Sequence, residues 1–187
     1  MVKKNACIFI SGQGSNLENL IKKSRDYNFP IKIRLIVSNN NKAKGIKYAK
    51  KNSIPYLIVD TRVRNYEYKI INELKKHKVS LICLAGYMKI LSKNFLNLYK
   101  QPIINIHPSL LPKFKGLNTF NRVIESKERK TGCTVHYVNK NLDSGNIIIQ
   151  KVFYIKKSDN EEILKNKTQY LEYRAFPEAI IKVFRKN

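Results

Sequence analysis

Short runs of apolar residues alternate along this chain with stretches in which apolar and polar positions recur at helical spacing. A short apolar run bounded by turn-forming residues is typical of a buried strand, whereas apolar positions three and four residues apart indicate an amphipathic helix. On these patterns we expect strands over residues 6–10, 31–37, 56–59, 79–85 and 103–106. We expect helices from about residue 17, over about 43–52 and over about 65–77.

The alternation of strands and helices predicts an α/β fold with a mostly parallel, twisted sheet and helices on both faces. Strands that are apolar throughout agree with this class, because parallel strands are buried on both faces. After about residue 130 two β-rich segments, 133–138 and 147–155, predict an antiparallel pair. A closing helix is expected over about 160–185, and Pro177 is where it would bend, because proline lacks an amide donor. With no repeat or linker in the sequence, we expect one Rossmann-like domain over residues 1–187.

The start of the chain is basic and is followed by the apolar run 6–10. That run is too short for a signal-peptide core, and no apolar run approaches the roughly 20 residues that cross a bilayer. Three cysteines, an odd number without framework spacing, fit a reducing compartment. We therefore expect a cytoplasmic protein.

The chain is strongly basic, with 37 Lys and Arg against 13 Asp and Glu and a formal net charge of +24. Such a protein attracts polyanions, with binding that weakens as salt rises. The basic residues are nevertheless spread over the whole length, with no basic block and no signature of a nucleic-acid-binding fold. Lys, Asn and Ile share A/T-rich codons, so we favour compositional drift as the cause. We expect no specific nucleic-acid partner and no membrane partner.

A glycine-rich loop over residues 11–16, with the sequence SGQGSN, follows the first strand and precedes the first helix. Ligands bind at this end of parallel strands, where a helix start offers N–H groups to an anion. The loop is no dinucleotide fingerprint, because Leu17 stands in place of the third glycine, and it lacks the Gly-Lys-Ser/Thr of a P-loop. A phosphate site and a plain turn with Ser15 or Asn16 as helix cap both remain open at this point.

The segment 105–112, NIHPSLLP, places an amide and an imidazole directly after an apolar strand. Residues two apart on an extended segment point to the same side, so Asn105 and His107 can face one pocket. There they could polarise one carbonyl group, and Asp143, brought in by the fold, could favour the charged imidazolium. The alternative is a histidine that is merely hydrogen bonded beside the core. We favour the functional interpretation, which is that of an acyl-transfer site.

The other two histidines are given ordinary roles. Cys133 and His136 have a spacing that would suit zinc, but nothing supplies the remaining ligands and the segment alternates like a strand. We interpret His136 as structural or as a neighbour of site residues. His77, at the end of a lysine-rich helix, is expected to be solvated.

Motifs in one order and spacing carry a resemblance to a known family. They are SGQGSN at 11–16, LAGYMKIL at 84–91, NIHPSLLP at 105–112, GCTVH at 132–136 and DSG at 143–145. Over nearly its whole length the chain resembles the phosphoribosylglycinamide formyltransferases, folate-dependent enzymes of purine synthesis. The third motif is highly specific for formyl transfer from folate, although relatives share it.

The resemblance implies a formyl donor, 10-formyltetrahydrofolate, that is consumed as co-substrate, and an acceptor, the amine of glycinamide ribonucleotide, with no metal. It implies that Asn105 and His107 stabilise the negative oxygen of a tetrahedral intermediate and that Asp143 tunes His107. A monomer or a homodimer is consistent with it. The binding residues that it implies are Gly14, Ser15 and Asn16 for the acceptor's phosphate, Glu172 for its ribose, and Arg64, Met88, Lys89, Ile90, Leu91, Asn105 and Asp143 for folate, with Arg62 as the alternative to Arg64.

Three other classes of protein are weighed against this one. The formyltransferase of initiator methionyl-tRNA shares the NIHPSLLP-type block, but it has an additional carboxyl-terminal domain, for which 187 residues leave no room. The hydrolase of formyltetrahydrofolate has an additional amino-terminal domain, whereas this chain begins at the first strand. A non-enzymatic nucleic-acid-binding protein is disfavoured because the catalytic trio is intact.

Overall fold

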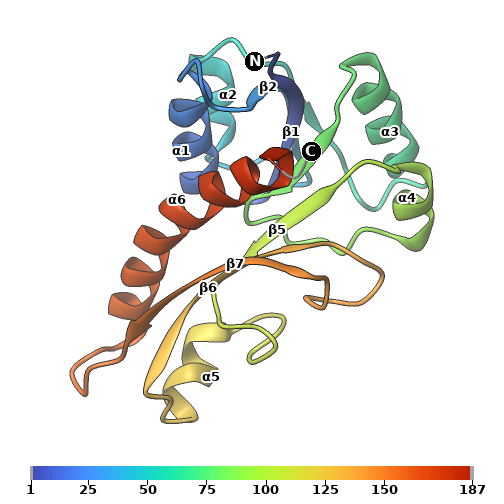
Figure 1. Ribbon diagram of the computed structural model, residues 1–187. Helices are drawn as coiled ribbons and strands as arrows, with labels where there is room; N and C mark the ends of the chain where they lie inside the picture. Colours follow the sequence, from blue (N-terminus) through green and yellow to red (C-terminus); the bar gives the residue numbers. More distant parts are fainter. Residues whose placement is uncertain (1, 186–187) are drawn as a thin grey trace. The chain divides into compact units, whose positions relative to one another are not determined.

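The computed structural model describes residues 2–185 and has the α/β fold that the sequence predicts (Figure 1). The strands follow the order β3-β2-β1-β4-β5-β6-β7 in a seven-stranded sheet. β1 pairs in parallel with β2 and β4, and β2 with β3, whereas β6 and β7 are antiparallel. The strands are β1 (Lys4–Ile10), β2 (Ile31–Ser38), β3 (Tyr56–Ile58), β4 (Leu81–Leu84), β5 (Ile103–His107), β6 (Lys130–Tyr137) and β7 (Ile147–Tyr154). The helices are α1 (Ser15–Ser24), α2 (Ile46–Lys51), α3 (Tyr66–Lys76), α4 (Lys93–Leu98), α5 (Thr119–Glu125) and α6 (Glu161–Arg185).

The helices α4 and α5 are not predicted by the apolar pattern. They have six and seven residues, too few for helical periodicity to stand out. α4 begins because the Ser92 hydroxyl accepts a hydrogen bond from the Phe95 amide at 3.0 Å, which satisfies an amide of the first turn. α2 begins at Ile46, directly after Gly45, and is shorter than expected.

The chain divides into two compact units, and the division falls within β5, between Ile104 and Asn105. We call them unit 1 (residues 1–104) and unit 2 (residues 105–187). The glycine-rich loop belongs to unit 1, and the trio Asn105, His107 and Asp143 belongs to unit 2. The single domain expected over 1–187 stays a prediction.

Unit 1 places its strands between two helical layers, with α1 and α2 on one side and α3 and α4 on the other (Figure 1). β1 lies between β2 and β4, and its residues from Ala6 to Ile10 are fully buried. Leu20 of α1 and Leu74 of α3 are also buried. An apolar central strand covered on both faces removes much apolar area from water, which is the main force that stabilises such a fold.

In unit 2 the long helix α6 packs against β6 and β7 (Figure 1). The helix continues through Pro177 over its 25 residues. One face of this helix is apolar and buried, as is needed for packing against a sheet. Its buried residues include Phe176, Ala179 and Ile180. This packing holds the strand pair whose connecting turn carries Asp143.

The three cysteines are buried free thiols, as expected for small core residues. Burial raises the pKa of Cys7, Cys83 and Cys133, so none is a thiolate at neutral pH. Within residues 2–185, none of the helices is both long and apolar enough to cross a bilayer. The cytoplasmic location stays a prediction.

Candidate active site

β5 presents Asn105 and His107 toward the same carboxylate, that of Asp143. The Asn105 Nδ2 atom donates to Asp143 Oδ1 at 3.4 Å. The His107 Nδ1 atom lies 3.3 Å from Asp143 Oδ2, and His107 and Asp143 are only 5% and 9% exposed. The tertiary structure thus brings together the amide, the imidazole and the carboxylate that the sequence singles out. Their catalytic roles stay a prediction.

Asp143 lies in the turn between β6 and β7, with a left-handed backbone at φ +44°. Aspartate tolerates this conformation better than most residues. The Gly116 amide donates to Asp143 Oδ2 at 2.9 Å. Burial by itself would raise the pKa of Asp143, but the ring of His136, the Gly116 amide and the charge of His107 together hold it below its ordinary value. Asp143 is therefore ionised at neutral pH.

Both ring nitrogens of His107 face oxygen atoms. Nε2 donates to the Phe114 carbonyl oxygen at 2.8 Å, and Nδ1 faces Asp143. A charged ring satisfies both contacts, whereas a neutral ring carries only one N–H. Burial lowers the pKa of His107, against the raising effects of the Phe114 carbonyl and of Asp143. Asp143 therefore acts in the direction expected from the sequence, but desolvation outweighs it and the net shift favours the neutral ring.

His136 completes the constellation, although the sequence places it only near the site. Its Nδ1 lies 2.8 Å from the Tyr137 carbonyl oxygen, which requires a donor there. Its Nε2 lies 3.2 Å from Asn105 Nδ2 and 3.6 Å from Asp143 Oδ1. The residue is 2% exposed. The signal that could have identified it is an ionisable side chain within a strand that is otherwise buried.

The zinc alternative for Cys133 and His136 has no further support. In the described part of the chain, no group of three or more His, Cys, Asp or Glu side chains could hold a metal ion.

The loop after His107 is fastened to β6 and β7 through one buried hydroxyl, that of Thr134. It donates to the Ser109 carbonyl oxygen at 2.6 Å and accepts from the Leu111 amide at 3.1 Å and the Gln150 amide group at 2.9 Å. Gln150 also donates to the Leu111 carbonyl oxygen at 3.0 Å. These bonds fix the backbone of the loop and therefore the position at which the next segment begins.

That next segment, residues 113–118, contacts both members of the His107–Asp143 pair. It supplies the Phe114 carbonyl to His107 and the Gly116 amide to Asp143. Phe114, Gly116 and Asn118 all have positive φ, at +56°, +79° and +52°. Such a backbone is disfavoured for residues other than glycine, so contacts with the rest of unit 2 must hold it.

In unit 1, Gly14 permits a close approach within the glycine-rich loop. It has φ +76°, and a Cβ there would lie 2.5 Å from the Gly45 Cα atom that precedes α2. Gly14 is also the N-cap of α1 and has no side chain with which to cap it. The alternative in which Ser15 or Asn16 caps this helix is not the one found, because the left-handed Gly14 is the N-cap and both residues lie in the first turn.

Ser11 ties the loop to neighbouring strand ends. Its hydroxyl donates to Asn39 Oδ1 at 2.5 Å and accepts from the Met88 amide at 2.7 Å. Its own amide donates to the Gly86 carbonyl oxygen at 3.1 Å. The loop, the end of β2 and the segment after β4 thus form one polar edge, as the carboxyl ends of parallel strands do.

The predicted folate residues of unit 1 differ in exposure. Met88 and Ile90 are 66% and 72% exposed, whereas Leu91 is buried. Lys89 is exposed. The Arg62 guanidinium is engaged by Asp60, at 2.7 Å between Nη2 and Oδ2, and lowers the pKa of that carboxyl to about 2.

Arg64 is exposed, and which of Arg62 and Arg64 faces folate stays a prediction. Glu172, the predicted ribose residue, lies half-buried on α6 in unit 2.

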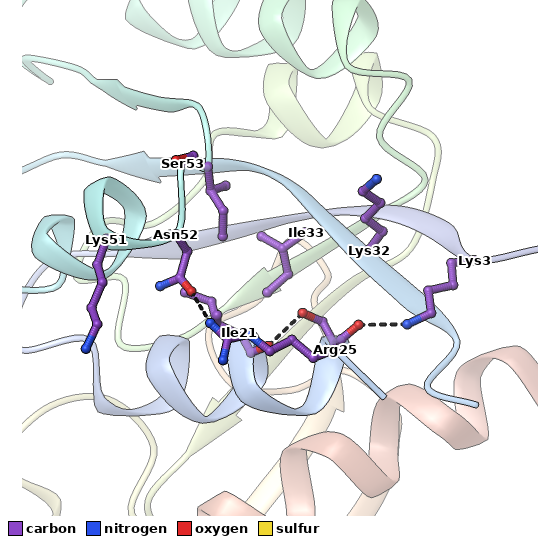
Figure 2. Close-up of a pocket in the computed structure, with 10 residues that line it drawn as sticks. Lys3, Ile21, Arg25, Lys32, Ile33, Lys51, Asn52 and Ser53 are labelled. Atoms are coloured by element: carbon purple, nitrogen blue, oxygen red, sulfur yellow. Dashed lines mark hydrogen bonds between the residues drawn. The ribbon is translucent and has the colours of Figure 1, made fainter. Parts of the chain in front are cut away.

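A basic hollow in unit 1 lies at the carboxyl-terminal ends of α1 and α2 (Figure 2). The Lys3 ammonium donates to the Ser24 carbonyl oxygen at 2.7 Å, and Arg25 donates to Asn52 Oδ1 at 2.6 Å. Figure 2 shows Lys32 directed away from Arg25. Cations are favoured at helix carboxyl ends by the helix dipole. Two of the basic residues of the lining, Lys3 and Arg25, thus have partners within unit 1.

Comparison with known proteins identifies the family to which this fold belongs. The profile of the formyl transferase family matches residues 4–180, and the chain belongs to that family. Within it, the chain is 40% identical over 185 residues to the phosphoribosylglycinamide formyltransferase of Haemophilus influenzae, covering 97% of this chain and 87% of that protein. The crystal structure of the phosphoribosylglycinamide formyltransferase from Bacillus halodurans is similar with a TM-score of 0.92 at 34% identity, covering 98% of this chain and 96% of that one. The family resemblance seen in the motifs is confirmed.

The chain also matches a small part of much longer proteins. It is 40% identical over 184 residues to the trifunctional purine biosynthetic protein adenosine-3 of Chironomus tentans, covering 95% of this chain but only 13% of that protein. The corresponding protein of Drosophila pseudoobscura is 41% identical and is covered to 14%. The chain therefore spans about one seventh of the length of these relatives.

Proposed function

We propose that this chain transfers the formyl group of 10-formyltetrahydrofolate to the primary amine of glycinamide ribonucleotide in purine biosynthesis. The observation that carries the proposal is the contact of the half-buried Asn105 and the buried His107 with the buried Asp143 carboxylate, in a member of the formyl transferase family. Formyl transfer needs a donor to the developing oxyanion and a group that accepts and returns a proton. The identity to the Haemophilus influenzae phosphoribosylglycinamide formyltransferase supports this acceptor.

We further propose how the substrates are held. The start of α1 at Gly14, Ser15 and Asn16 takes the acceptor's phosphate, because backbone N–H groups at a helix start attract anions. The ribose is bound by Glu172. No metal takes part, and the enzyme acts in the cytoplasm as a monomer or homodimer, without a membrane or a specific nucleic-acid partner. The folate residues are Arg64, Met88, Lys89, Ile90, Leu91, Asn105 and Asp143.

The proposed chemistry begins with attack of the amine on the formyl carbon, which forms the new C–N bond and places the carbonyl electron pair on oxygen. Asn105 donates its amide N–H to that oxyanion. The neutral His107 accepts on Nδ1 the proton that the amine loses, because Nε2 already donates its proton to the Phe114 carbonyl. Asp143, which faces Nδ1, stabilises the resulting imidazolium, and the positive charge of the ring stabilises the oxyanion. The intermediate then collapses: the bond to the folate nitrogen breaks, and that nitrogen takes the proton back from His107.

Incubation of the purified chain with 10-formyltetrahydrofolate and an acceptor tests the proposal. With glycinamide ribonucleotide we expect stoichiometric formylation of the amine, followed by mass spectrometry and by the absorbance of the tetrahydrofolate product. Methionyl-tRNA should stay unformylated, and without acceptor no formate should be released. Formylation of tRNA, or rapid acceptor-independent hydrolysis, would replace the proposed function by that of a relative.

The phosphate assignment predicts the effect of Asn16→Asp. A carboxylate at the start of α1 would repel the acceptor's phosphate, so KM for glycinamide ribonucleotide should rise about tenfold, the order of one lost charge-assisted contact. KM for 10-formyltetrahydrofolate should change little. Initial-rate kinetics with each substrate varied in turn measures both constants, and equal increases would contradict the assignment.

The proposed role of His107 as proton acceptor predicts a pH dependence. Below the pKa of His107 the ring is already protonated, so kcat/KM should fall as pH decreases through that pKa, which lies below the ordinary value. Asp143 raises this pKa, so Asp143→Asn should move the acid limb to lower pH. A pH–rate profile, with the imidazole signals titrated by NMR as a turnover-independent control, measures the shift. A limb that moves to higher pH in Asp143→Asn would contradict the assignment.

A further inference from the structure

Arg122, an exposed arginine of α5, holds the backbone that contacts the His107–Asp143 pair. Its Nη1 donates to the Lys115 carbonyl oxygen at 2.6 Å and lies 3.4 Å from that of Leu117. Its guanidinium carbon is 5.7 Å from the centre of the Phe114 ring, within cation–π range. The Arg122 side chain thus contacts the Phe114 ring and the carbonyl oxygens of Lys115 and Leu117.

Two other backbone groups of the same stretch contact the His107–Asp143 pair. The Phe114 carbonyl accepts from His107 Nε2, and the Gly116 amide donates to Asp143 Oδ2. The carbonyl groups of residues 115 and 117 therefore point toward Arg122. The Phe114 carbonyl contacts the imidazole instead, and the Gly116 amide contacts the carboxylate. A shift of this backbone would move both contacts together.

The stretch depends on such outside contacts, because Phe114 and Gly116 have positive φ. Two other bonds assist: Thr119 donates to the Gly116 carbonyl oxygen at 3.2 Å, and the Lys115 ammonium donates to Ser144 Oγ at 3.2 Å. Each is longer than the 2.6 Å contact that Arg122 makes with Lys115.

We propose that Arg122 is a positioning residue for the His107–Asp143 pair, acting through the backbone of residues 114–117. This inference rests on the proposed formyl transfer for its kinetic consequence. The charged and titratable groups that face His107 are Asp143, His136 and Arg122. Arg122 lowers the pKa of His107 by repulsion, as does His136, whereas Asp143 raises it. Arg122 therefore has two separable effects on the pair, one geometric and one electrostatic.

Two substitutions separate these effects. Arg122→Ala removes both: kcat should fall about tenfold through misplacement of the pair, the pKa of His107 should rise, and hydrogen exchange of the Gly116 amide should accelerate. Arg122→Lys keeps the charge but loses the planar group that stacks on Phe114 and contacts two carbonyls. It should restore the pKa of His107 while kcat stays low and Gly116 exchange stays fast. KM for both substrates should change less than about twofold in either variant, because the proposal gives Arg122 no contact with substrate.

Arg34→Ala is the matched control, because Arg34 is an exposed arginine of β2 in unit 1 and its removal changes net charge equally. It should behave as the parent chain. Unaltered kcat and Gly116 exchange in Arg122→Ala, or parental kcat in Arg122→Lys, would overturn the positioning role. The NMR titration and the exchange rates need no turnover. If the parent chain fails to formylate glycinamide ribonucleotide, they still decide whether Arg122 acts on the pair.

Discussion

Replacement of His107 by alanine is expected to lower kcat for formyl transfer by about 10²–10³, the usual cost of losing one group that stabilises a developing oxyanion. The variant also loses the proton acceptor, and Asp143 loses the ring that it contacts at 3.3 Å. Single-turnover kinetics at saturating substrates measures the chemical step directly. KM for either substrate should change far less than kcat, because the lost interaction is made mainly in the transition state.

His77→Ala is a suitable control for this experiment. His77 follows α3 in unit 1, and its ring lies 3.5 Å from the Glu73 carboxylate. Its side chain is only 18% exposed, so the expectation that His77 is solvated is wrong, because the last turn of α3, through Glu73, lies against the ring. Its removal should leave kcat at the parental value. Both variants should keep the circular dichroism spectrum of the parent. Near-parental turnover by a folded His107→Ala chain would remove the proposed mechanism.

Replacement of Gly132 by alanine is expected to produce a large loss of stability. Gly132 lies on β6, and a Cβ there would be 1.8 Å from the Lys151 carbonyl oxygen and 3.1 Å from Leu110 Cδ2. Backbone on β7 cannot rotate away as a side chain can, so the strand pair must separate. We expect the free energy of unfolding to fall by about 3 kcal/mol or more, at the upper end of overpacking effects. Denaturant titration measures the change.

Gly12→Ala provides the comparison for that measurement. A Cβ at Gly12 would meet no atom within 4 Å, so the free energy of unfolding should change little. If Gly132→Ala were as stable as Gly12→Ala, the close approach of β6 and β7 at that point would be contradicted. Because Asp143 lies on the turn that joins these strands, Gly132→Ala should also reduce the folded, active fraction.

The larger elements of the fold could be predicted because their signals are local. The run Ala6 to Ile10 is apolar on both strand faces, and it is fully buried in β1. The antiparallel pair and the closing helix are also found after about residue 130, where the sequence predicts them. Short elements were not predicted: α4 depends on one serine cap, and α5 follows a left-handed Asn118.

The candidate site was predicted in part for the same reason. Asn105 and His107 are two residues apart on a strand, so their common direction follows from strand geometry. The contact of His136 with Asn105 does not follow from it, because it depends on how β5 and β6 lie beside each other. The role of Gly14 as N-cap, in place of Ser15 or Asn16, depends on its close approach to Gly45.

The order of the amino acids alone specified the alternation of strands and helices, the glycine-rich loop after the first strand, and the placing of Asn105 and His107 on one side of a strand, because each is a property of neighbouring positions. Folding in three dimensions was required to place Asp143 against His107 and to let Arg122 grip the backbone that contacts both. It was also required to set the direction of the His107 pKa shift. That direction is a balance between burial and charge, and both depend on atoms contributed by segments far apart along the chain.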